Sequence, residues 1–259
     1  EGWIALLREA LSNPPASGQV RIDAEAQIDG TSLISGRAGA ALEGPFAAAA
    51  RAELPRFALT LDGELAGFGV DGELVSTGDD AFVVFFGENY RVGPERTAAA
   101  AARWGAAASE VNALAPAVPS WFVDLRYGDA EEIGGADAQQ IVAGLDGPRA
   151  GRDIAAVARA VGAPGLFEAL AAGAGPGTAE AWVAFDDRTL RRLRLEFPFQ
   201  VPADDRIPAL GAESGTVSLE VELSDLGEEV EIEPPPGGGF QPITQLTDRI
   251  ADLARLGGL

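Results

Sequence analysis

The feature that most constrains this fold is a strict alternation of apolar and polar residues over 20–29. The apolar positions of the segment are Val20, Ile22, Ala24, Ala26 and Ile28, and every residue between them is polar or charged. A period of two puts the two sets on opposite faces of a β-strand. The segment therefore predicts a strand with one buried and one solvated face, and Asp29-Gly30 predicts a tight turn after it.

Similar strand patterns recur along the chain at intervals of about 10 residues. In the first half they predict strands at 33–42, 46–54, 57–61, 65–76, 81–86 and 90–92. In the second half they predict strands starting at 121, and strands at 139–145, 179–185, 190–199, 217–223 and 230–233. Short strands at this spacing, joined by turns such as Asp62-Gly63, are typical of an antiparallel meander.

Apolar residues at helical spacing predict four helical stretches. They are an N-terminal helix at 3–12, helices at about 95–115 and 152–171, and a C-terminal helix at 242–256. The two middle stretches interrupt the run of strands, so we expect them to cover one face of the sheet. The predicted fold class is α+β, with a large curved antiparallel sheet that often leaves a cavity beneath its helices.

The segment 76–94 links the sheet to the first middle helix, because a hairpin at 81–92 is followed directly by Gly93-Pro94. Its first strand is apolar on both faces: Phe82, Val84 and Phe86 lie on one, and Val83 and Phe85 on the other. A sheet with one solvated face would carry polar residues on that side. We therefore predict that both faces pack, one toward a cavity or lid and one against another element such as the N-terminal helix.

The composition excludes several classes of function. The chain has no Cys, His, Met or Lys, and all nineteen basic residues are Arg. Without Cys and His there is no thiol nucleophile, thiolate metal site or Ser-His-Asp triad, so we expect no cofactor and no metal. A net charge of −21 repels phosphate backbones, so we expect no nucleic-acid partner.

The charged motifs favour structural roles. Paired acids at 79–80, 131–132, 186–187 and 204–205 all stand at turn signals. A general acid/base pair needs two carboxylates facing each other in a dry cleft, so a hydrolase is the least favoured function. The basic cluster of Arg191, Arg192 and Arg194 leaves two interpretations open. The favoured one is an exposed strand face that balances nearby acids, and the other is a lipid head-group contact.

The order of elements and several stretches resemble the LolA/LppX-like family of envelope lipoproteins. Residues 75–92 (VSTGDDAFVVFFGENYRV) resemble the family's hairpin before the first lid helix. Further likeness lies in the hairpin at 130–145 (AEEIGGADAQQIVAGL), the helix that begins at 152–156, and the closing strands at 182–197 and 217–235. The likeness covers most of the chain.

The resemblance implies a single domain over 1–259, a half-barrel sheet covered by helices on its concave side, and an apolar cavity without catalytic residues. It also implies a monomeric, extracytoplasmic protein of the cell membrane or envelope. We expect membrane attachment through an N-terminal lipid anchor missing from this sequence, because no start Met and no lipidated Cys are present.

The predicted function is non-enzymatic carriage of a lipid or acyl chain. The alternative is a structural or signalling lipoprotein domain with a closed core, acting through a protein partner. Inward strand positions and apolar helix faces give the predicted ligand-binding residues: Phe57, Leu59, Phe85, Trp104, Val111, Leu195 and Phe197.

Overall fold

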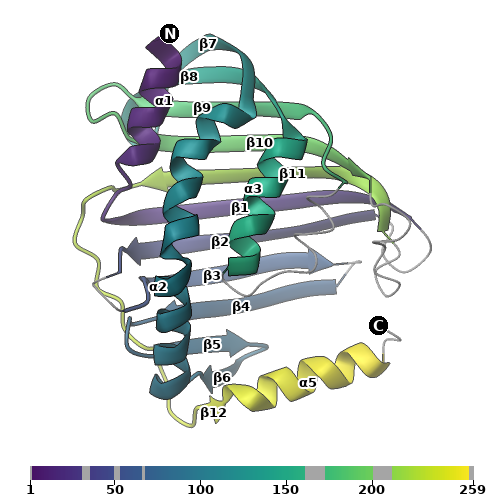
Figure 1. The fold of residues 1–259 in the computed structure, drawn as a ribbon. Coiled ribbons are helices and arrows are strands. Elements are labelled where there is room, and N and C mark those ends of the chain that lie inside the picture. The colour runs from purple at the N-terminus through teal and green to yellow at the C-terminus, as the bar shows by residue number, and fades with distance from the viewer. Residues whose placement is uncertain are drawn as a thin grey trace.

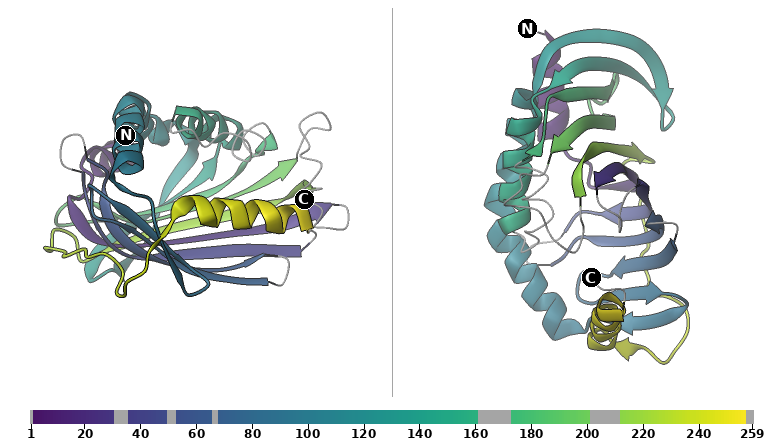
Figure 2. Two further views of the ribbon diagram at one scale, coloured as in Figure 1. Left: turned by 90° about the horizontal axis from the view of Figure 1, so that it is seen from below. Right: turned by 90° about the vertical axis from the view of Figure 1, so that its right-hand side faces the viewer.

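The computed structural model describes residues 2–30, 36–49, 53–65, 68–160, 173–200 and 212–256. Its strands are β1 (Ser17–Gly30), β2 (Gly36–Ala47), β3 (Arg56–Leu65), β4 (Phe68–Ser76), β5 (Ala81–Phe85), β6 (Glu88–Arg91), β7 (Phe122–Ile133), β8 (Ala136–Leu145), β9 (Gly177–Ala184), β10 (Leu190–Gln200), β11 (Ala212–Ser224) and β12 (Gln241–Pro242). Within the described residues these twelve strands form one large, open, curved sheet (Figures 1 and 2).

The sheet is the predicted antiparallel meander. Its order is β12-β6-β5-β4-β3-β2-β1-β11-β10-β9-β8-β7, so strands consecutive in sequence are mostly neighbours in space. The pair β1 and β11 joins the two halves of the chain, with Val20 opposite Leu223 and Ala26 opposite Val217. Among the described strands, only β12 runs parallel to its neighbour, β6.

Two predicted strands are wrong. Residues 46–54 do not form a strand of their own, because β2 extends to Ala47, and Ala47 already pairs with Arg56 of β3. Of the residues between these partners, the described ones (48, 49 and 53–55) are in no strand. Residues 230–233 are also outside the sheet. The chain leaves β11 through a turn in which Asp225 and Gly227 have φ of 51° and 83°, and the Gly227 N–H donates to the Ser17 carbonyl.

The described helices are α1 (Gly2–Ser12), α2 (Pro94–Ala117), the 3-10 turn η1 (Val118–Trp121), α3 (Gly147–Ala160) and α5 (Ile243–Leu256). Figure 1 shows α1, α2 and α3 side by side over one face of the sheet. The helix expected at 152–171 starts earlier, at Gly147, because Oδ1 of Asp146 accepts the Arg149 N–H at 3.1 Å and caps the first turn. Its expected C-terminal part lies outside the described residues.

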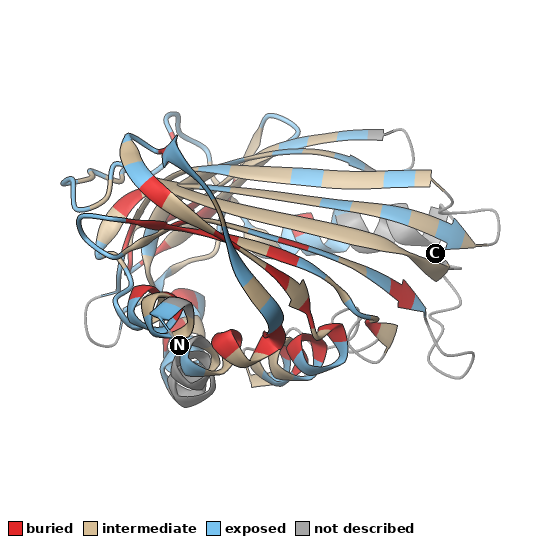
Figure 3. Ribbon diagram, turned by 90° about the horizontal axis from the view of Figure 1, so that it is seen from above, coloured by how far each residue is buried: buried red, intermediate tan, exposed pale blue. Residues whose placement is uncertain are grey.

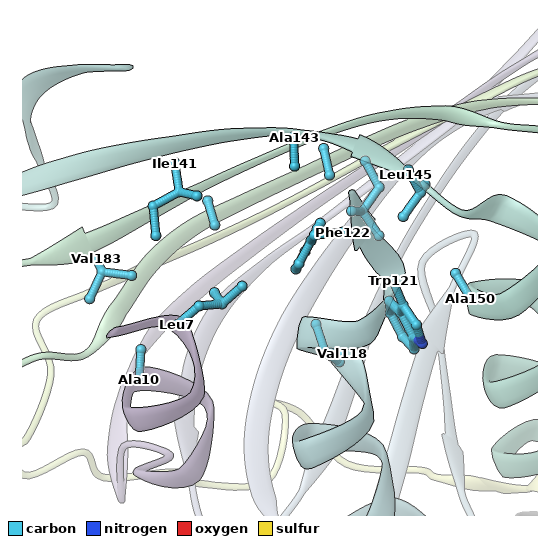
Figure 4. Close-up of a cluster of buried hydrophobic side chains, with 13 residues drawn as sticks. Leu7, Ala10, Val118, Trp121, Phe122, Ile141, Ala143, Leu145, Ala150 and Val183 are labelled. Carbon is cyan, nitrogen blue, oxygen red and sulfur yellow. The ribbon is translucent and has the colours of Figure 1, made fainter. Parts of the chain in front are cut away.

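A close-packed core lies at the β7–β10 end of the sheet. Inward side chains of β8 and β9 meet α1, η1 and α3 there (Figure 4); its buried members include Leu7, Val118, Trp121, Phe122, Ile141, Leu145 and Val183. The indole N–H of Trp121 donates to Oδ2 of Asp153 at 2.7 Å, which fastens α3 to η1. Figure 3 shows the buried residues near the helices, while the long strands farther away are mostly half-buried or exposed.

One face of strand β5 packs against another element, but that element is not the suggested N-terminal helix; Val83 and Phe85 on the other face are half-buried. The ring of Phe82, 6% exposed, lies 5.1 Å from that of Phe240, in the segment that leads into β12. Helix α1 instead packs against β7, β9 and β10, at the other end of the sheet. Phe86 belongs to the turn after β5 with φ of 47°, so it does not extend the row of Phe82.

Candidate functional site

A cavity of about 520 Å³ lies between α3 and the sheet, away from the close-packed core. Its lining on the sheet comes from six neighbouring strands, β4, β3, β2, β1, β11 and β10. Its apolar lining consists of Ala24, Ala26, Ala38, Ala40, Leu61, Val70, Ile154, Ala174, Leu195, Phe197, Val217 and Leu219, together with Gly39, Gly63 and Gly151. A volume of this size falls in the usual range of small-molecule sites.

The cavity exists because its floor carries very small side chains. Ala24, Ala40 and Gly63 stand opposite one another on three neighbouring strands, and Ala26 pairs with Ala38 in the next row. Ala40 is exposed although it lies on the face that the helices cover. The helices do not fill the space, because α2 and α3 pack mainly on each other. Larger side chains at these positions would close the cavity.

The charged side chains of the described lining point away from the interior of the cavity. Glu25 and Glu64 are part of its lining. Each follows, in strand alternation, a residue that faces the cavity, so their carboxylates point to the opposite face. The described lining therefore offers apolar surface without a charged group directed inward, and it suits a hydrocarbon ligand better than a polar substrate.

The predicted ligand-binding residues fall into three groups. Leu195 and Phe197 line the cavity. Phe57, Leu59 and Phe85 share its face of the sheet by register, but they lie beyond its lining.

Of the two predicted residues on α2, only Trp104 can be placed, and it lies outside the described lining. Trp104 is 39% exposed, and the side chain of Val111 lies outside the described residues. Sequence reasoning missed the alanines of the floor, Ile154 of α3, and Val217 and Leu219 of β11. The available signal was the run of Ala and Gly at alternate positions of β1 and β2, where a filled core would carry Leu, Ile or Val.

A polar cluster lies farther along the same face of the sheet. Oε2 of Glu88 accepts hydrogen bonds from the Tyr90 hydroxyl at 2.7 Å and the Gln241 amide at 3.3 Å, and it pairs with the Arg249 guanidinium. Arg249 also donates to the Tyr90 oxygen at 2.8 Å. The hydrogen bond from Tyr90, and then that from Arg249, lowers the pKa of Glu88 below its ordinary 4.5. The cluster fastens α5 to β6.

The basic cluster of the sequence lies mostly on the opposite face. Arg192 donates to Glu222 at 2.6 Å, and Nε of Arg194 donates to Glu220 at 2.6 Å, across β10 and β11. This cross-strand arrangement agrees with the favoured interpretation, an exposed face that balances nearby acids. Arg191 pairs instead with Asp187 in the preceding turn.

The acid pairs that fall within the described residues have structural partners or are exposed. Oδ1 of Asp80 accepts the Gly93 N–H at 3.0 Å and so ties the start of α2 to the sheet. Asp187 caps its turn through the Thr189 N–H at 2.9 Å, and the pair at 131–132 is exposed. The pair at 204–205 lies outside the described residues. Within the described part of the chain, no group of carboxylates is arranged to hold a metal ion, and no helix is long and apolar enough to cross a membrane.

Comparisons with known proteins identify similar solved structures only. No protein-family model and no curated protein matches the chain. The lipoprotein LppX of Mycobacterium tuberculosis is similar at a TM-score of 0.47 and 16% identity, over 90% of this chain and 98% of that one. LprF of Mycobacterium bovis is similar at a TM-score of 0.48 and 13% identity, over 90% and 97% of the two chains.

A LolA-superfamily protein of Nitrosomonas europaea also matches, at a TM-score of 0.26 and 10% identity, over 88% of this chain and 94% of that one. At such scores and identities, nothing about a ligand or partner is taken from these proteins. The matches agree with the resemblance to LolA/LppX-like proteins that the sequence predicts.

Proposed function

We propose that this protein is a non-enzymatic carrier that holds a lipid or acyl chain in the cavity between α3 and the sheet. In this proposal the helices cover the concave side of a half-barrel, and the chain is one domain that works outside the cytoplasm, at the membrane or in the envelope. The observation that carries the proposal is an apolar cavity of about 520 Å³ into which no charged side chain of the described residues is directed.

The energy of such binding comes from transfer of hydrocarbon out of water. Each buried CH₂ contributes about 0.8 kcal/mol, so an acyl chain of about 16 carbons supplies on the order of 12 kcal/mol before ordering costs. Those costs amount to several kcal/mol, and the remainder suffices for tight but reversible binding. Hydrogen-bonding groups are needed only where a head group leaves the cavity.

The alternative, a structural or signalling domain that works through a protein partner, requires a closed core. Among the residues that the structure describes, a close-packed interior occurs at the β7–β10 end only. The hollow floor around Ala40 is unnecessary for a purely structural sheet, and an unfilled apolar space lowers stability. The cavity therefore favours the carrier.

The test is to purify the protein from a lipid-containing host and to analyse it by native mass spectrometry and by organic extraction. We expect a co-purified lipid that organic solvent removes, and saturable binding of cis-parinaric acid to the delipidated protein. If no lipid co-purifies and the fluorescent fatty acid does not bind, the proposed function is wrong.

A further inference from the structure

The apolar face continues beyond the cavity in one direction. Leu61, which lines the cavity, pairs with Gly72 of β4, and Gly72 pairs with Phe85 of β5. Directly opposite residues of neighbouring strands point to the same face, so this row leads from the cavity across two strands. Gly72 contributes no side chain of its own to this row, and Cδ2 of Phe85 lies 3.5 Å from the position where a Cβ of Gly72 would stand. Next to it, Leu74 and Val83 form a parallel apolar row, and both are only half-buried.

Both rows end at β6, where the polar cluster begins. Phe85 pairs with Glu88, and Val83 pairs with Tyr90, which is 1% exposed. The carboxylate of Glu88 holds Arg249 of α5, and Leu246 of the same helix is buried. In the right-hand view of Figure 2, α5 is seen nearly end-on at the lower end of the molecule, and it contacts β6 and β12.

We propose that α5 is the end wall of the ligand compartment, and that the Glu88–Arg249 pair fixes the longest acyl chain that the compartment accepts. The inference rests on the proposed function. The first part of the bound acyl chain lies in the cavity. Its distal part occupies the apolar rows. The support is the unbroken register from Leu61 to Phe85 and the position of α5 at its end.

This arrangement gives the pair a role in specificity. An acyl chain that fits between the cavity and α5 buries every carbon, and a longer chain meets the helix. While Arg249 stays on Glu88, the additional carbons remain in water and add no affinity. When the pair is broken, α5 can shift, and the additional carbons become buried in the space that the helix leaves.

The test is a chain-length series. Lauric, palmitic and arachidic acids are titrated as competitors of cis-parinaric acid against the wild type, Glu88→Gln and Arg249→Ala. In the wild type we expect affinity to rise with length and then level off. In the two variants it should keep rising, by roughly fourfold for each additional CH₂ that becomes buried, while the affinity for lauric acid stays unchanged.

Two further variants distinguish the end-wall role of the Glu88–Arg249 pair from a general loss of structure. Arg249→Lys keeps a cation beside Glu88 and should keep the wild-type limit. Arg194→Ala removes a cation from the opposite face of the sheet and should leave the whole series unchanged. Circular dichroism melting checks that each variant is folded.

The possible outcomes are distinct. Equal changes in affinity at every chain length, or no change in the limit for either variant, would overturn the role of the Glu88–Arg249 pair while leaving the carrier function intact. A wild type that binds none of the three acids would overturn the carrier function itself, and the end wall with it.

Discussion

The substitution Ala40→Leu tests whether the floor of the cavity is the binding surface. Ala40 lies between Ala24 and Gly63 on the neighbouring strands, and its methyl group faces the open space. A leucine here projects three additional carbons into the cavity without meeting a large neighbour in its own row. The substitution takes space from the ligand while leaving the backbone of the sheet intact.

The size of the effect follows from the displaced hydrocarbon. Three carbons of leucine replace about three CH₂ groups of the ligand, each of which contributes about 0.8 kcal/mol when buried. Binding should weaken by about 2.4 kcal/mol, or roughly sixtyfold in Kd. The apo protein should gain stability by about 0.5–2 kcal/mol, as cavity-filling substitutions commonly do.

The assay pairs a cis-parinaric acid titration with urea unfolding of the delipidated protein, and Ala41→Leu is the matched control. Ala41 is the next residue of the same strand and faces the other side, between Asp23 and Asp62. It should leave the Kd unchanged. If Ala40→Leu instead destabilises the apo protein by about 1–3 kcal/mol, the site is close-packed rather than hollow, and the reasoning from small residues is refuted.

Three other changes have expected outcomes. Asp153→Ala removes the acceptor of the buried Trp121 N–H and should lower the free energy of unfolding by about 2 kcal/mol in urea titrations. The pKa of Glu88 is lowered on folding, so its contribution to stability is present above its ordinary 4.5 and is lost as the pH falls through the lowered value. Urea midpoints of the wild type should therefore drop more steeply below about pH 5 than those of Glu88→Gln. Arg194→Ala breaks a solvent-exposed pair with Glu220 and should cost less than about 1 kcal/mol by the same assay.

The meander could be predicted because its signal is local. Alternation in β1 and the spacing of the turns fix which residues share a face, and a shift of one residue would bury the charged set. The limits of strand prediction are equally physical. Residues 46–54 contain Phe46 and several Ala, a pattern that predicts a strand; the pairing of Ala47 with Arg56, which no local pattern encodes, sets the end of β2 and the start of β3.

The site was harder to predict than the fold, because a cavity is defined by missing volume. Reasoning from large apolar residues found Leu195 and Phe197, which line the cavity, and selected Phe57 and Trp104, which do not. The decisive residues are small, and a single alanine such as Ala40 is also common in ordinary packed sheets. Only the register, which aligns several small residues on neighbouring strands, turns them into a floor.

The length of α2 and its attachment at both ends keep the floor of the cavity uncovered. Helix α2 has 24 residues and is about 36 Å long. Asp80 ties its first turn to the sheet through Gly93, and η1 anchors its other end in the core beside Trp121. A helix bends only gently, so one that is held at both ends cannot follow a curved sheet down to its floor. At the β7–β10 end, side chains as large as Ile141 and α1 bridge the resulting gap and form a core; around Ala40, small side chains leave it open. The same fixed helices therefore produce a closed core at one end and a cavity at the other, and side-chain size decides which.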